Sequence, residues 1–136
     1  MATLVKQDSL TESLAKGEFD FSSDTLKVML VTDSYTPSTA HSLVSDVSSF
    51  EVSGTNYTAG GIALANVAVS TAGGVATVDA DDLVIDKDPA GFSGARYVCL
   101  VSGTKLLATA DLGSDRTNVA VVLTLQLAAA GLFTIS

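Results

Sequence analysis

The sequence predicts a mainly β protein, an antiparallel β-sandwich or barrel-like domain with a short helix or arm at the N-terminus. Roughly seven to nine short apolar runs recur at spacings of about 8–15 residues, separated by turn residues, a pattern typical of sandwiches and barrels. The clearest run places five apolar residues at strict period two over residues 119–127, which is the spacing of a half-buried strand. We expect one domain over residues 1–136, with the helix or arm at about residues 1–22.

A short amphipathic helix is expected over residues 8–16, where two leucines four positions apart would share one face. Ser9 or Asp8 can cap its start, and Glu12 lies at capping-box distance from Ser9. Gly17 is placed to end it. A helix of about two to three turns needs a packing partner to persist, so we expect it to pack on the rest of the domain.

Extended segments make up most of the remaining chain. Residues 25–32 carry apolar side chains on both faces, which predicts a strand in the middle of a sheet. Gly73 and Gly74 predict a hairpin turn, and a second tight turn is expected at residues 102–104. The expected strands lie at residues 25–32, 62–69, 75–80, 83–85, 96–101, 105–110, 119–127 and 132–135. Turns or loops are expected at residues 33–38, 86–94, 111–118 and 128–131, with one helical turn at residues 42–47.

The composition argues against several classes of function. Apolar residues make up 47% of the chain and charged residues 16%, against about 25% charged in a typical soluble domain, so we expect neighbouring subunits to cover part of the surface. The net charge of −8 repels phosphates, and the seven basic residues are scattered. Neither a nucleic acid nor a membrane is therefore expected as a partner. No apolar run reaches the roughly 18 residues of a membrane span, so we expect a soluble protein made in the cytoplasm.

Residue types that commonly carry catalysis are scarce. The single histidine, His41, lies in a polar loop, and the single cysteine, Cys99, lies in an apolar run, where a free cysteine is usually part of the core. The two residues are far apart in sequence, so no pairing of nucleophile and base can be inferred. We expect no enzymatic activity, no catalytic residues and no cofactor.

One acidic run has the character of a metal site, since calcium prefers several carboxylate and carbonyl oxygens from one loop. Its spacing matches no EF-hand loop, so no metal ligand is assigned. Calcium binding stays open beside the stronger alternative, charge that faces solvent or a subunit and protects a strand edge from unwanted pairing. The run comprises Asp79, Asp81, Asp82, Asp86 and Asp88.

A long motif runs through the first half of the chain. It consists of KVMLVTDSYTP from Lys27, then His41 and SDV at residues 45–47, then EVSGTNYTAGG from Glu51 and LAN from Leu64. This pattern resembles a family of small structural proteins of tailed bacteriophages, described as capsid-associated or tail-associated. The second half of the chain agrees with that family in character alone.

The resemblance implies a virion protein made in the host cytoplasm. Its partners would be the major capsid protein or other virion subunits, and we expect a homo-oligomer. A capsid decoration (cement) protein is preferred, because a compact acidic β-domain can clamp neighbouring capsid subunits and the chain lacks the repeats or heptads of a fibre. The alternatives are a tail, neck or head-fibre component and a receptor- or glycan-binding module. Candidate loop anchors or subunit contacts in the motif are Tyr35, Pro37, Tyr57, Gly60 and Gly61.

Overall fold

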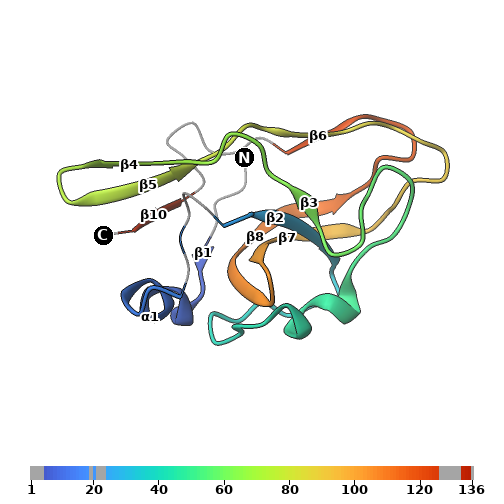
Figure 1. Ribbon diagram of the computed structural model, residues 1–136. Coiled ribbons are helices and arrows are strands. Elements are labelled where there is room, and N and C mark those ends of the chain that lie inside the picture. Colours follow the sequence, from blue (N-terminus) through green and yellow to red (C-terminus); the bar gives the residue numbers. More distant parts are fainter. Residues whose placement is uncertain (1–4, 19, 21–23, 126–132, 136) are drawn as a thin grey trace.

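The computed structural model describes residues 5–18, 20, 24–125 and 133–135 (Figure 1). These residues form antiparallel sheets and one short N-terminal helix, which confirms the predicted mainly β class. The elements are β1 (Val5–Lys6), α1 (Asp8–Ala15), β2 (Lys27–Thr32), η1 (Val44–Asp46), η2 (Ser48–Phe50), β3 (Ile62–Ala63), β4 (Ala68–Ala72), β5 (Val75–Asp79), β6 (Leu83–Ile85), β7 (Ala95–Ser102), β8 (Lys105–Arg116), β9 (Leu123–Leu125) and β10 (Phe133–Ile135).

The described strands form a two-layered arrangement. A five-stranded sheet has the order β1-β8-β7-β2-β3, and the second layer contains the three-stranded sheet β10-β5-β4 and the ribbon β6-β9 (Figure 1). Leu30 of the large sheet packs in one apolar cluster with Ile85 and Leu123 of the ribbon. Val78 of β5 packs in a second cluster with Leu100 of the large sheet. Alternating apolar side chains thus bury one face of the large sheet against both smaller sheets.

The opposite face of the large sheet is covered by residues 33–50. Met29 and Cys99 on this face pack in one cluster with Tyr35 and Val47 of the covering segment. Because β2 is covered on both faces and lies between β7 and β3, its predicted central position is confirmed. Cys99 is fully buried, as expected for a core residue, and burial raises the pKa of its thiol to about 12.

Both predicted hairpins are present. The β4–β5 turn places Gly73 at φ 60° and Gly74 at φ 82°, the positive values that a two-residue turn of type I′ requires. The β7–β8 hairpin closes on the pair Ser102 and Lys105. The helical turn expected at residues 42–47 is the 3-10 turn η1.

The N-terminal helix forms, but its predicted capping is wrong. α1 begins at Asp8, so that Gln7 is the N-cap residue, and no side chain caps the helix. Glu12 pairs instead with Lys16 one turn later, at 2.6 Å. The helix ends as predicted before Gly17, whose φ of 70° lies in the left-handed region.

Three strand boundaries differ from the prediction. The run expected at residues 62–69 is divided into β3 and β4 by Asn66, which has a φ of 55°. Residues 111–116, expected as a turn, belong to β8. Asp111 pairs with Tyr97 and Arg116 with Ala95, so residues 112–115 form a bulge opposite a single residue of β7, and Leu112 of this bulge packs against the core.

The strand expected at residues 119–127 is shorter than predicted. Among the described residues of this run, 119–125, Leu123–Leu125 is extended and paired, with Leu123 and Leu125 buried, whereas Val119 and Val121 are exposed in a bend. The bend follows Asn118, whose buried side chain is hydrogen-bonded on all sides, as described below. Leu127 and the turn expected at residues 128–131 lie outside the described residues, and β10 confirms the last strand over its described part.

Candidate functional site

Tyr57 of the motif is a buried loop anchor. Its hydroxyl accepts a hydrogen bond from the Leu30 backbone N–H at 3.1 Å and donates one to Glu51 Oε2 at 2.6 Å. The Gly60 N–H donates to the same carboxylate oxygen at 2.9 Å. Burial, together with the hydrogen bond to Glu51, raises the pKa of Tyr57 well above its ordinary value, so the phenol stays protonated and able to donate.

This network closes the edge of β2 where β3 stops. β3 pairs only with the first two residues of β2, and beyond them Val52 N–H donates to the Leu30 carbonyl at 3.0 Å, while Val31 forms a bridge with Glu51. The Tyr57 hydroxyl takes the Leu30 N–H that a full partner strand would bind. The motif thus satisfies buried backbone groups.

Gly60 and Gly61 turn the chain from this loop into β3. Gly60 has a φ of 89° and Gly61 a φ of 110°, values that disfavour any residue with a Cβ. A Cβ on Gly61 would lie 3.0 Å from the Val28 carbonyl oxygen and 3.1 Å from Lys27 Cβ. The glycines are therefore required by the backbone path and by its close approach to β2.

Tyr35 and His41 bind each other within the covering loop, and Gln7 joins this loop to the N-terminal segment. The buried Tyr35 hydroxyl and His41 Nδ1 form a 2.7 Å hydrogen bond, and burial raises the pKa of Tyr35 to about 12. The buried Gln7 amide donates to the carbonyls of Ser38 at 2.6 Å and of His41 at 2.7 Å. Pro37 is exposed in the same loop. The contacts of Gln7 could not be predicted from the sequence, because Ser38 and His41 are remote from it.

Asn118 is a buried hub that sequence reasoning missed. Its Oδ1 accepts the Phe92 N–H at 2.8 Å, and its Nδ2 donates to the carbonyls of Asp86 at 2.9 Å and Thr55 at 3.1 Å. Three loops are thereby joined at one end of the molecule. The contact is so close that a Cβ on Gly91 would collide with Asn118 Oδ1. An asparagine within a polar stretch ahead of an apolar run gives no sequence signal for this role.

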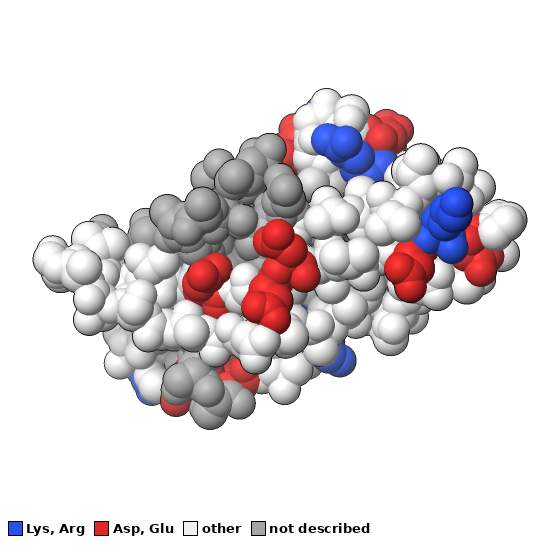
Figure 2. Space-filling view, turned by 90° about the horizontal axis from the view of Figure 1, so that it is seen from above, with Lys and Arg blue, Asp and Glu red and all other residues white. Residues whose placement is uncertain are grey.

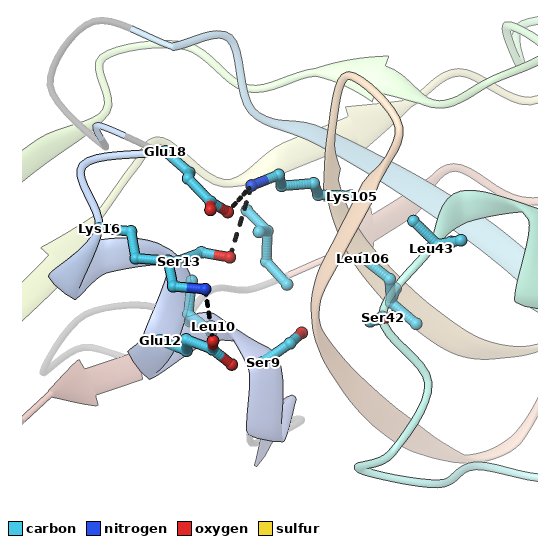
Figure 3. A pocket seen from close by; sticks show the side chains of 11 residues that line it. Ser9, Leu10, Glu12, Ser13, Lys16, Glu18, Ser42, Leu43, Lys105 and Leu106 are labelled. Carbon is cyan, nitrogen blue, oxygen red and sulfur yellow. Dashed lines mark hydrogen bonds and ion pairs between the residues drawn. The ribbon is translucent and has the colours of Figure 1, made fainter.

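A shallow cleft of about 240 Å³ separates α1 from the β7–β8 hairpin turn (Figure 3). Lys105 reaches across it to Glu18 at 2.9 Å and Ser13 at 3.4 Å, and the hydrogen bond from Lys105 lowers the pKa of Glu18. Lys16 pairs with Glu12 on the helix side. The charges in this cleft are thus paired within the chain, and exposed pairs of this kind contribute little to stability.

The acidic run does not converge into a metal site in the described part of the chain, which contains no group of three or more His, Cys, Asp or Glu side chains arranged to hold an ion. Asp79 accepts a hydrogen bond from the Ala80 N–H, Asp81 from the Asn66 amide and Asp88 from the Ala90 N–H. These three carboxylates have separate local partners.

Three exposed valines, which we call the valine patch, lie on or next to the β6–β9 ribbon: Val84 of β6 is 57% exposed, Val121 in the bend before β9 58% and Val122 50%. Val84 pairs with Thr124 across the β6–β9 ribbon, so Val122, two residues before Thr124, is its diagonal neighbour on the outer face. The inner face carries the buried Ile85, Leu123 and Leu125. Apolar side chains grouped on the outer face of a ribbon are typical of an interaction surface.

We expect Tyr57→Phe to lower the free energy of unfolding by about 1–3 kcal/mol, because the Leu30 N–H and Glu51 lose a buried partner. Urea denaturation measures the change. Tyr97→Phe is the matched control, since the Tyr97 hydroxyl has no hydrogen bond within the described residues, and its effect should stay within about 0.5 kcal/mol. Equal effects of the two changes would contradict the anchor role.

We expect Asn118→Asp to be severely destabilising at neutral pH, by about 3 kcal/mol or more, because a buried carboxylate would face two carbonyl oxygens. Asn56→Asp is the matched control: the Asn56 amide donates to the same Asp86 carbonyl but is exposed. Thermal melts at pH 7 and pH 4 measure both variants. Partial recovery of the Asn118 variant at pH 4 is expected, and a melting temperature close to wild type at pH 7 would refute the hub.

Alkaline pH should destabilise the fold. Folding raises the pKa of Cys99 from 9.0 to about 12 and that of Tyr35 from 10.0 to about 12, and that of Tyr57 also rises. A group with a raised pKa stabilises the fold fully below its unfolded pKa and loses that contribution as pH rises toward its folded pKa. The urea midpoint should therefore be steady to about pH 8 and fall between about pH 9 and 12. A midpoint unchanged at pH 11 would contradict this.

None of the described helices is long and apolar enough to cross a membrane. Comparisons with protein-family models, with curated proteins and with solved structures give no match for this chain.

Proposed function

We propose that this chain is a structural protein of a tailed-bacteriophage particle, and specifically a decoration (cement) protein that binds across capsid subunits. The observation that carries the proposal is the resemblance of the motif in residues 26–66 to small phage structural proteins. The order and length of its blocks favour common descent over chance. Among the positions that such a protein can occupy in a virion, we propose the capsid surface.

The geometry of the motif is consistent with a structural role. Tyr57, Glu51, Gly60 and Gly61 are engaged in closing the β2 edge, and Tyr35 fixes the loop beneath the large sheet. Groups committed to internal contacts are ill suited to turn over a substrate. A rigid body of this kind can transmit load between the subunits it joins.

The valine patch offers the contact face for this proposal. Val84, Val121 and Val122 expose half or more of their area, and burying them on a capsid subunit would contribute about 25 cal/mol per Å² of apolar surface removed from water. The net charge of −8 would steer the domain toward a basic partner surface. If the protein binds the assembled shell but not its dissociated subunits, binding stabilises the shell by mass action.

We expect purified protein to bind phage heads that lack it and to raise the temperature at which they release DNA. Val84→Asp and Val122→Asp should each weaken binding by about tenfold or more, because each places a charge in a patch that binding would bury. Val5→Asp is the matched control, since Val5 is 54% exposed on β1 and lies outside the patch.

Co-sedimentation with heads and DNA-release melts measure these effects. If Val84→Asp and Val122→Asp bind heads as tightly as the wild type, the valine patch is not the contact face. Failure to bind any head would refute the decoration role, and antibody labelling of whole particles on tails or necks would favour the tail or neck alternative. Saturable binding to host-envelope sugars, lost in Tyr35 or Tyr57 variants, would favour a glycan-binding module.

A further inference from the structure

The β4–β5 hairpin extends away from the large sheet, and β4 is its outer strand (Figure 1). All five residues of β4 are exposed, whereas three residues of β5 are half-buried and Val78 is fully buried. β4 pairs with β5 on one side over its whole length. In the described part of the chain no strand pairs with its other side, so β4 ends the sheet.

The composition of this edge is unusual for an exposed strand. Residues 67–78 contain no charged residue and no proline, although the chain carries a net charge of −8. Exposed edges usually carry a charge, a proline or a bulge that prevents pairing with another chain, and β4 has none of these. Figure 2 shows the end of the molecule formed by this hairpin free of acidic and basic side chains, with acidic groups nearer the middle.

The hairpin geometry determines which backbone groups are available. In a two-residue turn the closing pair, here Ala72 and Val75, is hydrogen-bonded. Bonding alternates along an antiparallel pair, so Ser70 and Ala68 also bond to β5. The N–H and C=O groups of Val69 and Thr71 therefore point away from the sheet, and none of them has a backbone partner among the described residues.

We propose that β4 is a self-association edge, at which two copies of the chain pair antiparallel about a twofold axis beside Ser70. Val69 of one copy then exchanges both backbone hydrogen bonds with Thr71 of the other. Ser70 lies opposite Ser70 as a non-hydrogen-bonded pair, with the two Cα atoms about 4.5 Å apart. The two three-stranded sheets become one sheet of six strands, a closed and symmetric arrangement.

A second copy is the partner that the charge pattern fits. The small uncharged side chains of one β4 meet the same set in the other, and the nearest acidic residue of β5, Asp79, lies opposite Ala68 at the far end of the strand. A charged partner segment would find no complementary charge on this edge. Self-pairing keeps the carboxylates of two acidic molecules apart.

The interface is small, which sets its strength. Five residues span about 17 Å, and one strand pair of this length buries less than the roughly 1,000 Å² of a stable interface. We therefore expect a weak dimer in free solution, populated at high protein concentration. The inference does not depend on the proposed virion role, since purified protein alone tests it.

Cysteine cross-linking tests both the edge and its register. Ser70→Cys should form a disulfide-linked dimer under mild oxidation at least about tenfold faster than Thr124→Cys, another exposed strand position, on β9. Thr71→Cys should also be slow, because Thr71 would lie opposite Val69 of the other copy. The native Cys99 is buried and should not contribute.

Sedimentation equilibrium gives an independent measurement. Wild-type protein should show a concentration-dependent dimer that Ser70→Lys abolishes, since two lysines would face each other, whereas Thr124→Lys should leave it unchanged. The proposal is overturned if Ser70→Cys, Thr71→Cys and Thr124→Cys cross-link at equal rates. It is equally overturned if the wild type stays monomeric throughout the concentration range, or if Ser70→Lys dimerises as the wild type does.

Discussion

The need to satisfy the backbone of β2 determines much of this structure. β2 lies at the centre of the large sheet, covered on both faces, where an unpaired N–H or C=O group is costly. β7 pairs with its full length on one side, but β3 pairs with two residues on the other. The hydroxyl of Tyr57 and the backbone of Val52 complete that side. The loop after β2 therefore acts as part of the sheet, and its glycines follow from the close approach.

Asn118 solves the same problem at the end of the molecule. Three loops meet there, and the fully buried amide of Asn118 finds partners for both of its polar atoms in the Phe92 N–H and in the carbonyl oxygens of Thr55 and Asp86. The chain is bent over residues 118–121, and Val121 is exposed in this bend. Val122 faces outward for a different reason, because it alternates with the buried Leu123 ahead of the β6–β9 pairing.

Sequence patterns were sufficient for features governed by neighbours in the chain. The two hairpins depend on local glycine turns, and the central place of β2 follows from its two apolar faces. Features set by remote partners were missed or wrong. The bend at residues 118–121 interrupts the period-two pattern expected from residue 119. The helix begins after Gln7, whose side chain binds the loop near His41, and not at a cap formed by Ser9 or Asp8. In the candidate site, the alternative of a loop anchor could be stated for Tyr57, but its partners Leu30 and Glu51 could not be identified from the sequence.

The division of the chain between interior and surface bears on assembly. The motif on which the proposed function rests, residues 26–66, closes the β2 edge and forms the covering loop. The valine patch and the β4 edge both lie after residue 67. A contact surface must be complementary to its own partner, whereas a scaffold needs only to satisfy the hydrogen bonds and packing within its own chain. We therefore expect the residues that determine partner specificity to lie in the second half of the chain, on strands that the motif holds in place.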